Sequence, residues 1–91
     1  SKEVQDGLIG IETYKKEREN LEILVATTKK TQELSWARYE AGYSSYLELL
    51  DAERMQFDAA NNASIIRREQ LISLVKLYKA LGGGWDKNLN F

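Results

Sequence analysis

Small and apolar residues recur at alternating spacings of three and four over residues 2–40. This spacing is typical of a helix that packs along one stripe, or seam, against a partner helix. The seam residues are Ile11, Tyr14, Leu21, Val25, Thr28, Ser35 and Tyr39, with Arg18 and Gln32 at the two remaining positions. The pattern predicts one long helix whose coiled-coil seam is interrupted by polar residues.

Two glycines, Gly7 and Gly10, lie near the start of this predicted helix. Each destabilises a helix interior by about 1 kcal/mol relative to alanine. A glycine has no Cβ, so it also lets a neighbouring backbone come close. We therefore expect the first turns to lie close to another segment.

A second pattern of the same kind predicts a helix over residues 46–81. Its predicted seam holds Leu47, Leu50, Phe57, Leu71, Val75 and Tyr78, with Arg54, Asn61, Ser64 and Arg68 at the other positions. The middle of this seam is polar. Residues 71–81, in contrast, are apolar around most of the helix, which predicts contact with more than one neighbour.

Turn-forming residues separate the two patterns. Gly42 can adopt the left-handed backbone conformation that ends a helix, and Ser44 and Ser45 can cap the next helix. Ser45 with Glu48 three residues later fits a capping box. The chain has no proline, so residues 41–46 are predicted to form the tip loop of an antiparallel hairpin, and three glycines at 82–84 open a tail over residues 82–91.

A turn centred near residues 43 and 44 also predicts which charges face each other. The expected pairs are Arg54 with Glu33, Asp58 with Lys29, and Arg68 with Glu19. Exposed pairs of this kind stabilise a protein by only about 0.2 to 1 kcal/mol each. They support the register of the hairpin more than its stability.

The predicted fold class is all-α: a single domain, residues 1–91, forming a long antiparallel two-helix coiled-coil hairpin. Two helices bury only a thin seam, so association into a helical bundle is expected. The 13 basic and 14 acidic residues give a net charge of -1, which indicates neither nucleic-acid binding nor attraction to an anionic membrane. The opening residues have a helical pattern, so the chain is expected to be part of a longer protein.

The chain contains neither cysteine nor histidine. Disulfides, thiol nucleophiles, imidazole catalysis and the common zinc sites are therefore excluded. Glu48 and Asp51 share a helix face, but two acids at a helix start are also favoured by the helix dipole alone. We expect no catalytic residues, no cofactor and no metal, and no apolar run reaches the roughly 20 residues of a membrane span.

Two motifs give this chain a resemblance to a known family. RYEAGYSSYLELLDAER at residues 38–54 and REQLISLVKLYKALGGGW at residues 68–85 resemble the C-terminal region of TolC-like outer membrane efflux proteins. The similarity is greatest to the lipoprotein branch that serves RND-type pumps. The shared positions are Arg38, Tyr39, Gly42, Tyr46, Leu47, Leu50, Asp51, Ala52 and Arg54, followed by residues 77–85.

The resemblance implies a place in a Gram-negative efflux system. Such proteins are homotrimeric ducts with a barrel in the outer membrane and a tube of helices in the periplasm, and they work with a periplasmic adaptor protein and an inner-membrane pump. This chain resembles one hairpin of that periplasmic tube. Contact with the membrane is expected only through parts of the parent protein outside this chain, and the exported substrates would be multiple drugs or other small molecules.

The resemblance also implies roles for residues at the tip. The adaptor would dock on Gly42, Tyr43, Ser44, Ser45, Tyr46 and Leu47. Glu48 and Asp51 would contribute to a ring of carboxylates at the entrance of the lumen, which favours cations. Arg38 and Tyr39 would hold neighbouring hairpins together in a closed state. Some family members carry an arginine where this chain has Ser44.

An alternative interpretation needs no transport role. In it the chain is a structural coiled-coil hairpin that associates with copies of itself. Tyr39, Tyr43 and Tyr46 then shield the open end of the hairpin, and Trp36 serves in packing.

Overall fold

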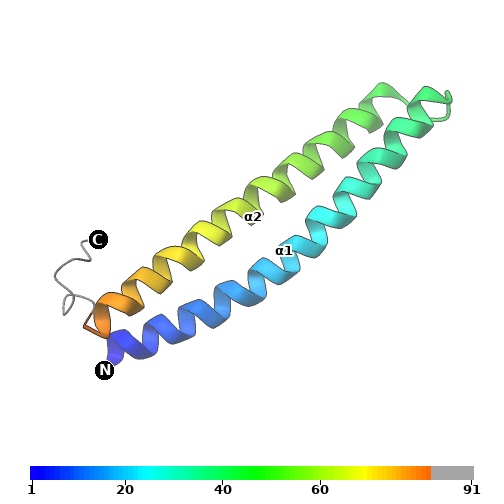
Figure 1. Ribbon diagram of the computed structural model, residues 1–91. Helices are drawn as coiled ribbons and strands as arrows, with labels where there is room; N and C mark the ends of the chain where they lie inside the picture. Colours follow the sequence, from blue (N-terminus) through cyan, green and yellow to red (C-terminus); the bar gives the residue numbers. More distant parts are fainter. Residues whose placement is uncertain (83–91) are drawn as a thin grey trace.

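The computed structural model describes residues 1–82, which form two antiparallel helices lying side by side (Figure 1). Helix α1 spans Lys2–Glu40 and helix α2 spans Tyr46–Ala80. The molecule is a rod with extents of 63 × 24 × 14 Å. The prediction of an all-α helical hairpin is confirmed. The predicted tail lies outside the described residues from residue 83 onward.

The turn between the helices is built from local hydrogen bonds. Gly42 has a φ of +82°, and its N–H donates to the Tyr39 carbonyl at 3.0 Å. The Tyr43 N–H donates to the Arg38 carbonyl at 2.8 Å. This pair of bonds is the Schellman motif, in which a left-handed residue satisfies the last carbonyls of a helix. The predicted helix-ending role of Gly42 is confirmed.

Helix α2 begins at the serine that the sequence indicated. Ser45 has an extended backbone, with ψ 160°, and its side chain accepts a hydrogen bond from the Glu48 N–H at 3.2 Å. Within residues 1–82 the reciprocal bond, from the Ser45 N–H to the Glu48 carboxylate, is not formed. Only the first half of the predicted capping box is therefore present.

The seam of α1 follows the predicted pattern over most of its length. Thr28 is buried, and its hydroxyl donates to the Leu24 and Val25 carbonyls, so no polar group is left unsatisfied there. Six further predicted residues are half-buried: Ile11, Tyr14, Leu21, Val25, Gln32 and Ser35. Tyr39 was predicted wrongly, because it is exposed. Its ring meets the exposed ring of Tyr46 in the first turn of α2 instead of a seam residue.

The predicted seam of α2 is wrong over most of its length, although Val75 and Tyr78 near its end are half-buried as predicted. Its large members Leu47, Leu50, Phe57 and Leu71 are exposed. The residues that pack against α1 are Leu49, Ala52, Ala59, Ala63 and Leu77, with Gln56, Ile66, Gln70, Ser73 and Ala80 half-buried between them. This seam is displaced by two residues, which is about 200° around the helix, so the contact face is nearly the opposite one. We call the exposed large residues Leu47, Leu50, Phe57 and Leu71 the outer face of α2.

The two helices lie close together where the glycines of α1 face the observed α2 seam. A Cβ built on Gly7 would stand 3.1 Å from the Leu77 Cβ and 3.4 Å from the Leu77 Cα. A Cβ on Gly10 would stand 3.3 Å from the Ser73 Oγ. The predicted close approach at both glycines is confirmed, and the neighbour is α2 itself.

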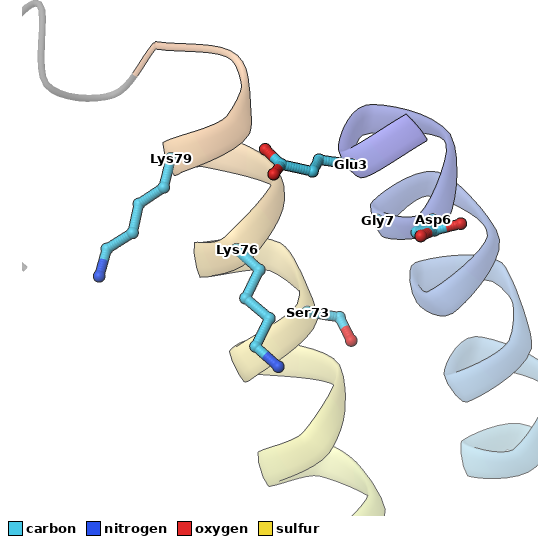
Figure 2. A pocket seen from close by; sticks show the side chains of 6 residues that line it. All are labelled: Glu3, Asp6, Gly7, Ser73, Lys76 and Lys79. Carbon is cyan, nitrogen blue, oxygen red and sulfur yellow. The ribbon is translucent and has the colours of Figure 1, made fainter. Parts of the chain in front are cut away.

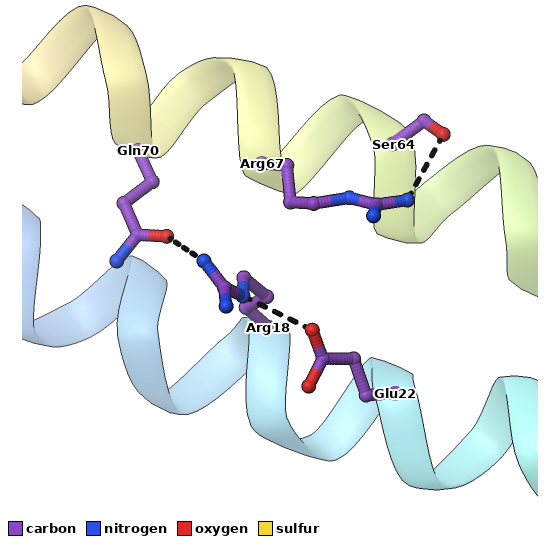
Figure 3. Close-up of polar contacts among 5 residues, drawn as sticks. All are labelled: Arg18, Glu22, Ser64, Arg67 and Gln70. Atoms are coloured by element: carbon purple, nitrogen blue, oxygen red, sulfur yellow. Dashed lines mark hydrogen bonds and ion pairs between the residues drawn. The ribbon is translucent and has the colours of Figure 1, made fainter.

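The predicted ion pairs between the helices are also wrong. Arg54 pairs with Asp51 and Asp58 on its own helix, and Arg68 pairs with its neighbour Glu69. Long exposed side chains find partners one turn away more readily than across the hairpin. Figure 3 shows a polar contact that does cross: Arg18 donates to the Gln70 side chain at 3.2 Å while it pairs with Glu22 at 3.1 Å on α1.

Candidate functional site

The tip of the hairpin, residues 38–51, holds all of the site residues predicted from the sequence. Arg38 turns back over the loop, and its Nη2 lies 3.4 Å from the Tyr43 carbonyl as a hydrogen-bond donor. The Arg38 side chain is thus bound within its own hairpin. A contact of Arg38 with a neighbouring hairpin stays a prediction.

Three aromatic rings form a row that joins the two helices at the tip. The Tyr39 and Tyr46 ring centroids are 5.6 Å apart with planes tilted by 49°, and Trp36 follows 6.3 Å from Tyr39 with a tilt of 45°. Tilted contacts at these distances are favourable for aromatic rings. The row fastens the last turn of α1 to the first turn of α2, and Trp36 has the packing role expected of it.

The loop itself projects apolar surface into solvent. Tyr43 is 78% exposed and Leu47 is 76% exposed, so neither side chain contributes much to holding the hairpin together. A Cβ on Gly42 would meet no atom within 4 Å. The tip therefore offers open space at Gly42, flanked by two large side chains that have no cover within the described residues.

Ser44 differs from its neighbours because its hydroxyl points inward. The Ser44 Oγ is buried and has no hydrogen-bond partner within residues 1–82. A buried polar group without a partner destabilises a protein by about 1 to 3 kcal/mol. Of the two serines proposed for capping, only Ser45 caps α2.

The two acids predicted for the entrance ring lie in the first turns of α2, and both are exposed. Asp51 accepts a hydrogen bond from Arg54 Nη2 at 2.7 Å, and Arg54 Nη1 lies 3.9 Å from Asp58 Oδ2. The hydrogen bond to Asp51, followed by the charges of Asp51 and Asp58, raises the pKa of Arg54 above its usual value. Arg54 was not among the predicted site residues, although an acid three residues before it and another four residues after it signalled the pairing.

Two clefts lie toward the opposite end of the hairpin. The first, of about 460 Å³, lies between the first turns of α1 and the last turns of α2 (Figure 2). It is lined by Glu3, Asp6, Gly7, Ser73, Lys76 and Lys79. The second, of about 400 Å³, is lined by Ile11, Arg18, Arg67, Gln70, Leu71 and Leu74. Neither contains a residue predicted for the site.

The described residues also limit the chemistry available. Within residues 1–82 no group of acidic side chains is arranged to hold a metal ion. Neither described helix combines the length and the apolar character needed to cross a membrane. The site is an exposed tip that carries aromatic rings, two acidic side chains and a glycine, Gly42, with open space beside it.

Comparison with known proteins gives this hairpin a family. Residues 1–83 match the family described as outer membrane efflux protein. The chain belongs to the outer membrane efflux protein family. The match includes both helices and the tip, so the family resemblance based on the two sequence motifs is confirmed. No solved structure matches the chain.

Three similar proteins come from Pseudomonas species. The chain is 40% identical over 89 residues to the solvent efflux pump outer membrane protein SrpC of Pseudomonas putida, which covers 98% of the chain and 19% of the relative. It is 40% identical over 85 residues to the toluene efflux pump outer membrane protein TtgF of Pseudomonas putida, covering 93% and 18%. It is 38% identical over 88 residues to the outer membrane protein OprJ of Pseudomonas aeruginosa, covering 94% and 18%. The chain thus spans about a fifth of the length of these relatives.

Proposed function

We propose that this efflux family chain is one hairpin of the periplasmic helical tube of an outer membrane efflux duct, with its tip at the entrance of the tube. The observation that supports the proposal best is a rod 63 Å long, closed by a single tight turn, whose family match extends over both helices. The proposed role is transport, without catalysis. As the names of the relatives mention toluene and solvents, we propose that the exported substrates are small molecules, drugs included.

The proposed partner of the tip is a periplasmic adaptor protein, which in turn binds an inner-membrane pump. Tyr43 and Leu47 expose large apolar surfaces that a partner would cover, and Gly42 leaves space for a partner backbone. Residues 42–47 together form the proposed docking site. The intact duct is proposed to be a homotrimer that a lipid and a barrel anchor in the outer membrane of a Gram-negative bacterium.

The proposed role of Glu48 and Asp51 is to line the entrance aperture. Threefold repetition of exposed carboxylates makes a negative ring, which attracts cations and repels anions. Arg38 and Tyr39 are proposed to contact the neighbouring hairpin in the closed duct. The exposed ring of Tyr39 supports this role, although Arg38 must then exchange its bond to the Tyr43 carbonyl.

Adaptor docking is tested in the full-length duct. Tyr43→Ser with Leu47→Ser should weaken adaptor binding by about tenfold or more, since exposed aromatic and apolar anchors dominate protein interfaces. The same two changes should leave the hairpin folded. The control is Ile23→Ser, which removes a similarly exposed apolar side chain from the shaft. Unchanged adaptor binding by the tip variant, measured with purified proteins, would refute the docking site.

A second candidate function has an observation in its favour. The outer face of α2 presents Leu47, Leu50, Phe57 and Leu71 to solvent, and an apolar surface of this kind marks an interaction site. A self-associating structural hairpin would cover this surface with a second copy. The covering helices of an intact duct would do the same, so the surface alone does not decide between the two functions.

A further inference from the structure

Asp51 belongs to a column of alternating charges on α2. Arg54 follows Asp51 by one turn and precedes Asp58 by one turn, and all three side chains are exposed, away from the seam with α1. The guanidinium of Arg54 therefore lies between two carboxylates. It donates a hydrogen bond to Asp51 at 2.7 Å and approaches Asp58 to 3.9 Å. The guanidinium is always charged at working pH, and contact with Asp51 raises the pKa of Arg54 further.

Glu48 differs from Asp51 in its surroundings. It lies one turn nearer to the tip loop, and within residues 1–82 its carboxylate forms neither an ion pair nor a hydrogen bond. The two acids predicted for the entrance ring are thus unequal. Glu48 presents a full negative charge, whereas the charge of Asp51 is offset by a cation in direct contact.

We propose that Arg54 is a specificity-determining residue of the entrance: it offsets the charge of Asp51 and so limits how strongly the aperture holds cations. This inference rests on the proposed function, which places Glu48 and Asp51 at the entrance. A carboxylate and a guanidinium in contact act on an approaching ion as a dipole. At distances several times their 2.7 Å separation their fields largely cancel, and beyond about 8 Å salt screens what remains. Cation binding then depends mainly on Glu48.

The competing explanation is that Arg54 only stabilises the helix. Pairs three and four residues apart stabilise a helix by about 0.2 to 0.5 kcal/mol each, and exposed pairs often contribute less. Such a role predicts no change in the ion selectivity of the duct. Block of the conductance by a multivalent cation therefore separates the two roles.

The experiment measures the La³⁺ concentration that blocks half of the conductance of the full-length duct in a planar bilayer. Arg54→Gln should lower that concentration by about threefold or more, because one net negative charge is added per chain at the entrance. Arg54→Lys should stay close to the unmodified duct. The effect should shrink in 1 M salt, where the Debye length is about 3 Å.

The chain offers a matched control in Arg68→Gln. Arg68 is two heptads beyond Arg54 on the same side of α2, about 21 Å farther from the tip, and it pairs with Glu69. Arg68→Gln changes the net charge by the same amount and should leave the block unchanged. An equal effect of both glutamine variants would overturn the inference, because it would show that total charge rather than the entrance charge matters.

Further variants distinguish failure of this inference from failure of the proposed function. If Asp51→Asn weakens the block while Arg54→Gln leaves it unchanged, the inference is overturned and the proposed entrance stands. A weaker block in Arg54→Gln also overturns it, since Arg54 would then position Asp51 rather than offset its charge. If neither Glu48→Gln nor Asp51→Asn alters the block, the proposed entrance fails, and the inference fails with it.

Discussion

The turn of this hairpin depends on single residues whose backbone requirements are local. Gly42 has a φ of +82° and no neighbour within 4 Å of a built Cβ, so its role is conformational and involves no packing. Ser45 caps α2 through a bond to the N–H three residues later. Both roles were predicted from the sequence because they need nothing beyond the adjacent residues.

Replacing Gly42 tests this backbone requirement. Gly42→Ala should lower the free energy of unfolding by about 1 to 2 kcal/mol, since a Cβ disfavours the left-handed conformation. Gly42→Asn should cost less, because asparagine tolerates that conformation. Urea unfolding followed by circular dichroism measures both. Equal stability of the alanine variant and the unmodified chain would show that the turn does not require a left-handed residue.

At the scale of whole helices, the seam of α1 could be predicted from the sequence better than the seam of α2. On α1 the apolar residues and the contact residues coincide at most positions. On α2 two stripes run in parallel, one of large residues such as Phe57 and one of small residues such as Ala59 and Ala63, and the small stripe packs against α1. The larger hydrophobic stripe was chosen from the sequence, whereas the stripe that packs is the one that places Leu77 against Gly7 and Ser73 against Gly10.

A pair of substitutions two residues apart distinguishes these stripes. Ala59 is 3% exposed, so Ala59→Leu should overpack the seam and destabilise the hairpin by about 1 to 3 kcal/mol. Phe57 is 68% exposed, so Phe57→Ser should change the stability by no more than about 0.5 kcal/mol. Thermal unfolding of the two variants gives the comparison. A greater loss from Phe57→Ser would mean that the large stripe is the one buried.

At the scale of the whole molecule, the hairpin is a thin rod that buries little of its apolar surface. Three of its six buried residues within residues 1–82 are alanines, while Leu50, Phe57 and Leu71 lie on the outer face of α2. A seam this narrow contributes only a small free energy of folding. The rod is thus expected to gain stability from a further helical surface, whether a second copy or the rest of a duct.

Self-association of the chain follows from this exposed surface. Sedimentation equilibrium should show species larger than the monomer at tens of micromolar. The triple variant Leu50→Lys, Phe57→Lys, Leu71→Lys should shift the chain toward monomer, because three charges would have to be buried. Circular dichroism checks that both remain helical. A monomeric unmodified chain at these concentrations would contradict the expectation.

The candidate site was predicted only in part, for the same reason as the seam of α2. Glu48 and Asp51 lie at the tip because they follow the turn directly in the sequence. Arg54 was predicted to pair with Glu33 across the hairpin, yet its guanidinium bonds to Asp51 on its own helix. Which partner a long side chain takes depends on how the helix is rotated, and the sequence interpretation had the wrong rotation.

The sequence by itself determined the bounds of α1, the start of α2, that the chain reverses once at Gly42, and most of the seam of α1, since caps, turns and helical periodicity act over a few residues. The predicted end of the second helix, residue 81, is one residue beyond the observed end at Ala80. Only the tertiary structure decided which side of α2 faces α1. Two stripes of α2 could each form a coiled-coil seam, and the choice between them depends on how closely the two backbones approach. That distance is a property of both helices together, and no segment of the sequence encodes it alone.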